Sequence, residues 1–245
     1  MGKHTETIAL FVGDLHVGSK AGLSSKPSSR RQEWLLETWR RFQKDITKVL
    51  QGQNVILLLG GDLVDLPGDD DAEADAIALL QPIVKHARSL WGAYGTEYHV
   101  GSDGNDDKGI YRQLGAKHAH HMRFKVADKV LDWSHHGANV GRLPWTELNG
   151  LRQLAEARYW RCVQHNIPAP AVIVRHHVHV VPTGAPIHWR GIWATTVPCW
   201  KLGDAFSAKV APGAPPTIGA LVWRPERAEP PQVIRYDVPD ELVSG

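Results

Sequence analysis

The sequence predicts an α/β fold in which helices cover a sheet with parallel strands at its centre. Residues 7–12 (TIALFV) and 55–59 (VILLL) are short runs of mostly branched apolar side chains, which is typical of strands buried on both faces. A long amphipathic helix pattern over residues 30–50 separates them and has the length of a crossover connection. Each strand is followed by a Gly-Asp pair, at the edge where open α/β sheets bind their ligands.

Length and composition favour one globular domain over residues 1–245. The chain has 42% hydrophobic and 22% charged residues, an ordinary balance, and it is long enough to bury a sizeable core. The sequence contains no internal repeat and no low-complexity linker, so it indicates no domain boundary. The net charge of +2 gives no argument for nucleic acid or a membrane surface as a partner.

Targeting signals and cysteine usage point to the cytoplasm. The N-terminal stretch MGKHTETIALFVGDLH has no long apolar segment after its basic residue, so we expect no signal peptide. No run of the sequence is long and apolar enough to cross a bilayer. The two cysteines, Cys162 and Cys199, are expected to be free thiols in a reducing compartment. If a phage encodes the chain, that compartment is the host cytoplasm.

The first half of the chain is expected to alternate helices with loops around the two strands. Residues 19–29 are rich in Ser, Gly and Pro, which predicts a surface loop near the site. Residues 67–75 (PGDDDAEAD) are interpreted as a solvated loop leading into a helix N-terminus, with a second metal site as the alternative. Residues 76–88 have a helical pattern, with a kink or restart at Pro82. One side of the helix over residues 30–50 carries Trp34, Leu35, Thr38, Phe42, Ile46 and Val49.

The second half supplies further strands and a second long helix. Residues 145–165 predict that helix, with an interruption at Gly150, and residues 108–114 predict a short one. Strands are expected over residues 89–94, 171–174, 192–198, 218–223 and 232–238, and residues 123–133 are expected to form one strand or two. The strands within residues 192–238 are expected to complete the sheets.

Aspartate and histidine follow several of these strands at a spacing of two. Asp14 and His16 are two residues apart, so in an extended segment they point to the same side, as His177 and His179 also do. A carboxylate and an imidazole on one side form half of a metal site. The simpler interpretation is a polar turn, or for Asp62 a turn cap, but three histidines in residues 176–179 are hard to explain as core packing.

A six-residue set follows from these positions and suits two metal ions. His135 and His136 are adjacent, so only one of them is expected to point into the site. Oxygen and imidazole ligands without thiolate suit Mn, Fe, Zn or Ni. Two such ions about 3.5–4 Å apart can clamp a phosphate and activate a water or hydroxide. A nearby histidine can then protonate the leaving oxygen. The set is Asp14, His16, Asp62, His136, His177 and His179, with Asp62 as the bridge.

The same motifs resemble those of the calcineurin-like metallophosphoesterases, in particular small phage-encoded members. The matching segments, in order, are GDLH at 13–16, GDLVD at 61–65, HHG at 135–137 and RHHVH at 175–179. The resemblance implies a four-layer α/β/β/α sandwich with mixed sheets. It further implies that Asp14, His16 and His179 hold the first metal, that His136 and His177 hold the second, and that Asp62 is shared.

The chain departs from the family pattern at two places. His176 stands where the family has glycine, a departure that should be tolerated if its side chain can turn outward. The family's Gly-Asn-His motif, which supplies an Asn ligand and a substrate-facing histidine, has no clear counterpart in GTEYH at 95–99. Either Thr96 or Asn105 stands near the Asn position, or that ligand is missing and one metal binds. We assign the substrate-facing, catalytic role to His99.

The resulting expectation is a metal-dependent phosphoesterase acting on a phosphate monoester or diester, with two divalent ions as cofactors. Manganese is the metal expected first, with iron, zinc or nickel as alternatives. One alternative function is a nuclease of the same fold, for which a nucleotide or nucleic acid would be the substrate. Another is a metal-poor scaffold that binds a protein partner. The sequence names neither the substrate nor the oligomeric state, and it leaves open whether residues 19–29 or 201–216 close over the site.

Overall fold

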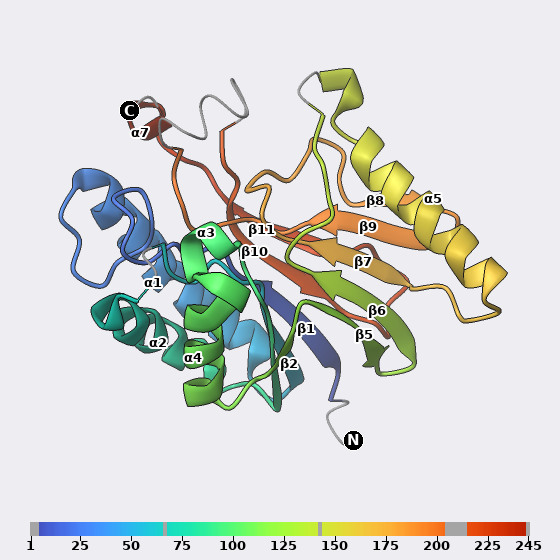
Figure 1. Cartoon of the computed structure of the whole chain (residues 1–245), viewed down its shortest axis with the longest axis horizontal. Helices are drawn as coiled ribbons and strands as arrows, with labels where there is room; N and C mark the ends of the chain where they lie inside the picture. The colour runs from blue at the N-terminus through green and yellow to red at the C-terminus, as the bar shows by residue number, and fades with distance from the viewer. Residues whose placement is uncertain (1–4, 66–67, 142–143, 204–214, 244–245) are drawn as a thin grey trace.

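Two mixed β-sheets pack face to face, with helices on both outer faces (Figure 1). This is a computed structural model, and it describes residues 5–65, 68–141, 144–203 and 215–243. The predicted α/β fold class, a sandwich with mixed sheets, is confirmed. Within the described ranges no helix is both long enough and apolar enough to span a bilayer. Cys162 and Cys199 are buried free thiols, as expected.

Sheet 1 has six strands in the order β11-β10-β1-β2-β3-β4. Strands β1 to β4 run parallel, whereas β10 pairs antiparallel with β1 and with β11. The carboxyl ends of β1, β2 and β3 therefore lie at one edge. The bounds are β1 Thr7–Val12, β2 Asn54–Leu59, β3 Ser89–Ala93, β4 Lys117–Ala119, β10 Ile218–Trp223 and β11 Gln232–Tyr236.

Sheet 2 has five strands in the order β5-β6-β7-β9-β8. Its three inner strands, β6, β7 and β9, are parallel, and an antiparallel strand closes each edge. Strand β9 lies in sheet 2, whereas β10 and β11 lie in sheet 1. The bounds are β5 His121–Val126, β6 Lys129–Ser134, β7 Val172–Arg175, β8 Ile187–Trp189 and β9 Ile192–Thr196.

Alternation along the strands produces the four layers. Ile8, Leu10 and Val12 face a core shared with helices α1, α2 and α4, whereas Phe11 faces the core between the sheets. On the far side, Leu151 of α5 packs against sheet 2. The helices are α1 Arg30–Leu50, α2 Asp70–Val84, α3 Glu97–Val100, α4 Asn105–Leu114, α5 Asn149–Gln164 and α7 Asp240–Val243, with short 3₁₀ turns η1 Ser102–Gly104 and η2 Pro144–Thr146.

The acidic stretch differs in part from its prediction. Its described residues start helix α2 six residues earlier than expected, because Asp69 caps the helix by accepting from the Ala72 N–H at 3.0 Å. Asp70 and Asp71 then lie in the first turn, where carboxylates favour the helix dipole. Pro82 is accommodated inside the helix, two residues before its end. None of the possible metal-holding groups among the described residues includes this stretch.

Other helices and strands begin or end at residues that differ from the predicted ones. Residues 123–133 form two strands joined at Ala127, whose φ is +53°, and helix α4 begins at Asn105 rather than at residue 108. Strands β4 and β8 were not expected, because three residues at a sheet edge carry too little pattern to identify. Loop residue Leu23 is buried, and its N–H donates to Leu15 O at 3.0 Å. Residues 19–29 therefore pack partly beside the first strand end, whereas most of 201–216 lies outside the described residues.

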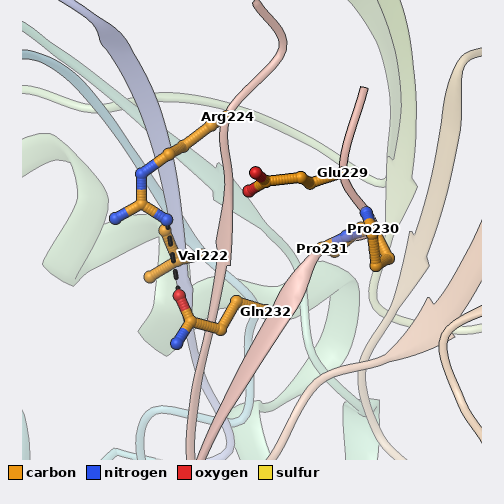
Figure 2. Close-up of a pocket in the computed structure, with 6 residues that line it drawn as sticks. All are labelled: Val222, Arg224, Glu229, Pro230, Pro231 and Gln232. Carbon is orange, nitrogen blue, oxygen red and sulfur yellow. Dashed lines mark hydrogen bonds between the residues drawn. The ribbon is translucent and has the colours of Figure 1, made fainter. Parts of the chain in front are cut away.

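A cavity of about 460 Å³ lies between the end of β10 and the start of β11 (Figure 2). Its polar side chains include Arg224, Glu229 and Gln232, and Arg224 donates to Gln232 at 3.4 Å. Strand β10 runs antiparallel to β1, so this cavity lies at the edge of sheet 1 opposite to the carboxyl end of β1. It is therefore separate from the candidate site described below.

Candidate metal centre

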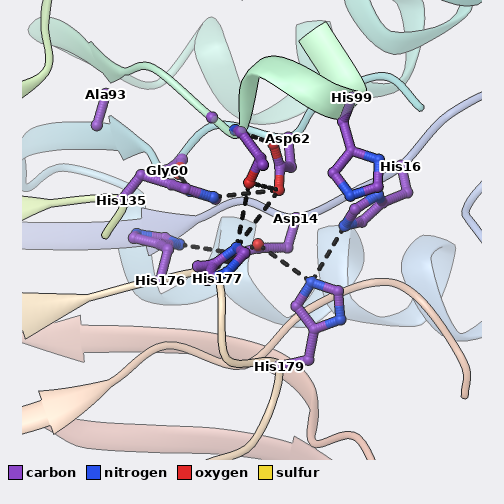
Figure 3. A network of polar contacts seen from close by, with 12 residues as sticks. Asp14, His16, Gly60, Asp62, Ala93, His99, His135, His176, His177 and His179 are labelled. Carbon is purple, nitrogen blue, oxygen red and sulfur yellow. Dashed lines mark hydrogen bonds and ion pairs between the residues drawn. The ribbon is translucent and has the colours of Figure 1, made fainter. Parts of the chain in front are cut away.

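The sequence-predicted ligands meet where the carboxyl ends of the inner strands of both sheets come together (Figure 3). Backbone hydrogen bonds hold the strand-end loops of sheet 1 to one another. The Asp14 N–H donates to Gly61 O at 2.9 Å, and the His16 N–H donates to Asp62 O at 3.0 Å. In sheet 2 the His176 N–H donates to His135 O at 3.0 Å. Residues distant in sequence are thus fixed within one small volume.

Five of the six predicted ligands have a left-handed backbone. Their φ angles lie between +47° and +72°, a region that side-chain-bearing residues seldom adopt. Each such residue costs about 1–3 kcal/mol, and this kind of strain concentrates at functional sites. The five are Asp14, His16, Asp62, His177 and His179. The left-handed turns aim their side chains toward one another, and this is the observation from which we infer a function.

The first subsite consists of Asp14, His16 and His179. The Nε2 atoms of His16 and His179 face each other at 3.1 Å, and His179 Nε2 lies 3.3 Å from Asp14 Oδ1. Two ligand atoms bound to one ion at about 2.1 Å lie roughly 3.0–3.4 Å apart, so these spacings fit a shared metal. Burial lowers the pKa of His16 to about 4, which leaves the imidazole neutral, as a ligand must be.

Asp65 is a member of this cluster that the sequence reasoning missed. Its Oδ1 lies 2.8 Å from His16 Nδ1, 2.5 Å from His99 Nδ1 and 3.7 Å from Lys201 Nζ. Burial alone would raise the pKa of Asp65, but its contacts with His16, His99 and Lys201 lower it well below the usual range. A carboxylate on Nδ1 fixes a histidine tautomer so that Nε2 is free to bind a metal. The sequence offered one signal for Asp65, namely its position as the last residue of the GDLVD segment.

The second group surrounds Asp62. Thr96 donates to both Asp62 oxygens, from its N–H at 2.5 Å and from Oγ1 at 3.1 Å, and its Oγ1 lies 3.2 Å from His177 Nδ1. His177 Nδ1 is 3.9 Å from Asp62 Oδ2. Asn105 is exposed at the start of α4, and no hydrogen bond found within the described ranges joins it to this group. Of the two alternatives for the Asn position, the structure therefore brings Thr96 to the site.

His136 and His99 lie on opposite sides of the cluster. The His136 ring is 4.7 Å from that of His177, and burial, followed by the neighbouring His135 and His177, lowers the His136 pKa to about 4. His99, on helix α3, packs edge-on against His16 at 4.6 Å between ring centroids. Its contact with Asp65 ties this histidine to the first subsite.

His176 turns inward, so the departure from glycine is accommodated in another way. Its ring is fully buried, with Nδ1 3.2 Å from Asp14 Oδ2. The space comes from Gly60 and Gly13, since a Cβ at Gly60 would overlap the His176 ring and one at Gly13 would lie 2.8 Å from Nδ1. The ring also stacks on that of His135, with planes 12° apart. The glycines that directly follow β1 and β2 thus compensate for the glycine that is missing at position 176.

We expect Gly60→Ala to destabilise the protein through this overlap. The added methyl group overpacks a filled core, which costs about 1–3 kcal/mol of unfolding free energy. The cost of Gly60→Ala should be much smaller in a His176→Gly background, because the overlapping ring is then absent. Thermal unfolding of the wild type, both single variants and the double variant measures this coupling, with Gly203→Ala as control, where the nearest atom is 3.9 Å away. An equal cost of Gly60→Ala in both backgrounds would contradict the buried position of His176.

His135 and Asp107 are buried titratable groups beside Asp62. His135 Nε2 is 3.1 Å from Asp62 Oδ2, and its Nδ1 contacts Gly60 O. Burial lowers the pKa of His135, but the Asp62 and Asp14 carboxylates outweigh that and raise it to about 9. Asp107 accepts the Gly95 N–H at 2.8 Å, and burial, assisted by Asp62, raises its pKa to about 7. The sequence analysis chose His136 over the adjacent His135. It did not single out Asp107, which lies in helix α4 and contacts a strand-end loop distant in sequence.

Comparisons with known proteins support the fold alone. The sequence matches no family model and no curated protein sequence. A solved structure described as a novel archaeal phosphodiesterase is similar over 94% of this chain and 99% of that one, with a TM-score of 0.51 and 10% identity. A protein of unknown function from Aquifex aeolicus matches 75% of this chain and 81% of its own, with a TM-score of 0.38 and 13% identity.

Proposed function

We propose that the chain is a metal-dependent phosphoesterase with a two-metal site. The observation that carries the proposal is the convergence of left-handed Asp and His residues from both sheets on Asp62. The donors are carboxylate oxygens and imidazole nitrogens without thiolate, a set suited to divalent transition metals in catalytic sites. In this proposal Asp14, His16 and His179 would hold one ion, His136 and His177 would hold the other, and Asp62 would be shared.

The chain's own residues would orient the reaction around these ions. Two bound divalent ions would neutralise the phosphate and lower the pKa of an attacking water. Asp65 Oδ1 lies 2.8 Å from His16 Nδ1. This contact would hold His16 in the tautomer that leaves Nε2 free to bind a metal. The same oxygen lies against His99 Nδ1, so Nε2 of His99 is the atom that would donate a proton to the leaving oxygen.

The proposal extends to the class of ester that is hydrolysed, the metal that is bound and the cellular setting. A phosphodiester belongs among the first substrates to test, because the archaeal structure with the same fold is described as a phosphodiesterase. Manganese, iron, zinc and nickel are all compatible with the donor set. Nucleotides and nucleic acids are members of the same ester class, and a cytoplasmic setting is consistent with two free thiols.

The direct test is a metal-reconstitution assay. Protein stripped by a chelator should be inactive and should regain hydrolysis of p-nitrophenyl phosphate, bis-p-nitrophenyl phosphate or both when Mn²⁺, Zn²⁺ or Ni²⁺ is added. The preferred ester then identifies the monoesterase or the diesterase. Failure to bind any metal, together with no turnover of either ester, would overturn the proposal in favour of a metal-poor scaffold. Two bound metals without turnover would exclude these two esters as substrates.

A further inference from the structure

The second subsite has a ligand position that no asparagine fills. Thr96 stands at the turn after β3, and its hydroxyl contacts Asp62 and His177. A neutral hydroxyl is a weak ligand for transition metals, compared with an imidazole. His135 brings an imidazole to the same carboxylate from sheet 2, and its ring is fully buried. The structure therefore offers a stronger donor than the Thr96 hydroxyl at the same Asp62 oxygen, Oδ2.

The orientation of His135 is that of a metal-bound histidine. Its Nδ1 contacts the backbone oxygen of Gly60, which can only accept, so Nδ1 carries a hydrogen. Nε2 then points at Asp62 Oδ2, 3.1 Å away (Figure 3). Ligating histidines characteristically donate their other ring N–H to a backbone carbonyl or a carboxylate. This arrangement supports ligation through Nε2.

We propose that His135 is a ligand of the second metal, in the role left open by the missing asparagine. The second subsite then consists of Asp62, His135, His136 and His177. This inference rests on the proposed two-metal function. One ligand atom from each of the three histidines lies within 4.8 Å of the others. His135 and His136 are adjacent but have perpendicular rings 4.6 Å apart, so a buried and an exposed imidazole approach the subsite from different directions.

The competing interpretation is that His135 only supports Asp62 through a charged hydrogen bond. The 3.1 Å separation of His135 Nε2 and Asp62 Oδ2 is also the distance of such a hydrogen bond. The two interpretations differ in metal stoichiometry. A supporting residue can be lost with a modest decrease in affinity, about 10–100-fold, whereas loss of a ligand removes more.

The proposed ligand set also has a consequence for metal choice. Three imidazoles and one carboxylate suit zinc, iron or nickel better than manganese, which prefers oxygen ligands. The first subsite, with Asp14 and Asp62 beside two histidines, is richer in carboxylate. We therefore expect the second subsite to discriminate more strongly against Mn²⁺ than the first does.

Cobalt titration of the full-length protein tests the assignment. Calorimetry should show two Co²⁺ ions per chain in the wild type and in Thr96→Val, which removes the hydroxyl that also contacts Asp62. His135→Phe should bind one ion, with the second weakened by more than about 100-fold. Thermal unfolding of the metal-free proteins controls for folding. Two ions bound to His135→Phe with the second weakened by less than about 100-fold, or loss of the second ion in Thr96→Val alone, would overturn the proposal.

A measurement on the wild type does not depend on whether the variant folds. The Co²⁺-loaded protein, labelled with ¹⁵N at histidine, should show a hyperfine-shifted Nδ1–H resonance that exchanges slowly, because the His135 Nδ1 is buried against Gly60. If the His135 resonance shows no contact contribution to its hyperfine shift, His135 is not a ligand. That result would refute this assignment but not the proposed metal centre. A wild type that binds no Co²⁺ would overturn both this assignment and the proposed function, so the two failures are distinguishable.

Discussion

Replacing Asp62 with asparagine is expected to abolish phosphate-ester hydrolysis under the proposed function. Asp62 is fully buried, and its carboxylate lies within reach of ligands from both subsites. Asparagine keeps the size of the side chain but removes the charge that would be shared by two cations. The expected decrease in kcat/KM is about 10³-fold or more, because bound ions contribute several kcal/mol to stabilisation of the transition state.

Metal content and activity should be measured together for Asp62→Asn. The variant should retain at most one metal per chain, whereas the wild type should retain two. Asp71→Asn is the matched control, since it removes a carboxylate exposed in the first turn of α2 and should leave both quantities unchanged. This control also tests the acidic stretch as a metal site. Activity of Asp62→Asn within a few-fold of wild type would exclude a catalytic role for the cluster.

The largest expected effect on stability is at Asp132, which joins four elements of the second half of the chain. Its carboxylate contacts Arg175 of β7, His121 of β5 and Arg158 of α5, with Arg158 Nε at 3.4 Å. Asp132 and Arg175 are both almost fully buried. Asp132→Asn would leave the Arg175 guanidinium buried without a charged partner, and breaking such a pair costs about 3–5 kcal/mol of unfolding free energy.

Thermal unfolding in the presence of a chelator measures this loss. For a chain of this length the change corresponds to a decrease in Tm of about 6–20 °C. Asp128→Asn is the control, because Asp128 is exposed and its pair with Lys129, at 3.7 Å, should contribute about 0–1 kcal/mol. A variant that unfolds within 2 °C of wild type, roughly half a kcal/mol, would show that the ion pair does not stabilise the fold.

The same pair predicts the dependence of stability on pH. Burial alone would raise the pKa of Asp132, but His121 and Arg175 outweigh it and lower the pKa from 3.8 to about 2. A carboxylate with a depressed pKa contributes its stability above the unfolded value of 3.8, and that contribution is lost as the pH falls through about 2. The difference in stability between wild type and Asp132→Asn should therefore be constant above pH 5 and decrease below pH 4.

The regular elements were largely predictable because their patterns are local. Strand β1 was predicted over residues 7–12, and helix α1 was predicted over 30–50, where one apolar face and the Ser29 cap determine its bounds. Element boundaries were harder to predict where an element is very short or where a contact with a residue outside the element determines it. The start of α2 depends on capping by Asp69, and edge strands β4 and β8 exist because a neighbouring strand pairs with them.

The residues of the candidate site also differ in how far the sequence could identify them. Asp14, Asp62 and the histidines of RHHVH stood out in the sequence because each follows an apolar strand pattern. Their direction comes from a left-handed backbone at Asp14, Asp62, His177 and His179, and not from the extended geometry that a spacing of two assumes. Asp65 and His135 were missed because their importance comes from partners distant in sequence: His16 and His99 for Asp65, and Asp62 for His135. Their contacts exist only after the two sheets have packed together.

The sequence by itself determined the α/β class, the two parallel strands that carry Asp14 and Asp62, and the chemical type of the donors. The tertiary structure decided which way each histidine turns. His176 points inward because Gly60, on another strand, leaves room for its ring, and His135 is buried because Asp62 and Gly60 lie opposite it. Side-chain direction in a loop depends on space and partners across the sheets, and this information is not contained in local periodicity.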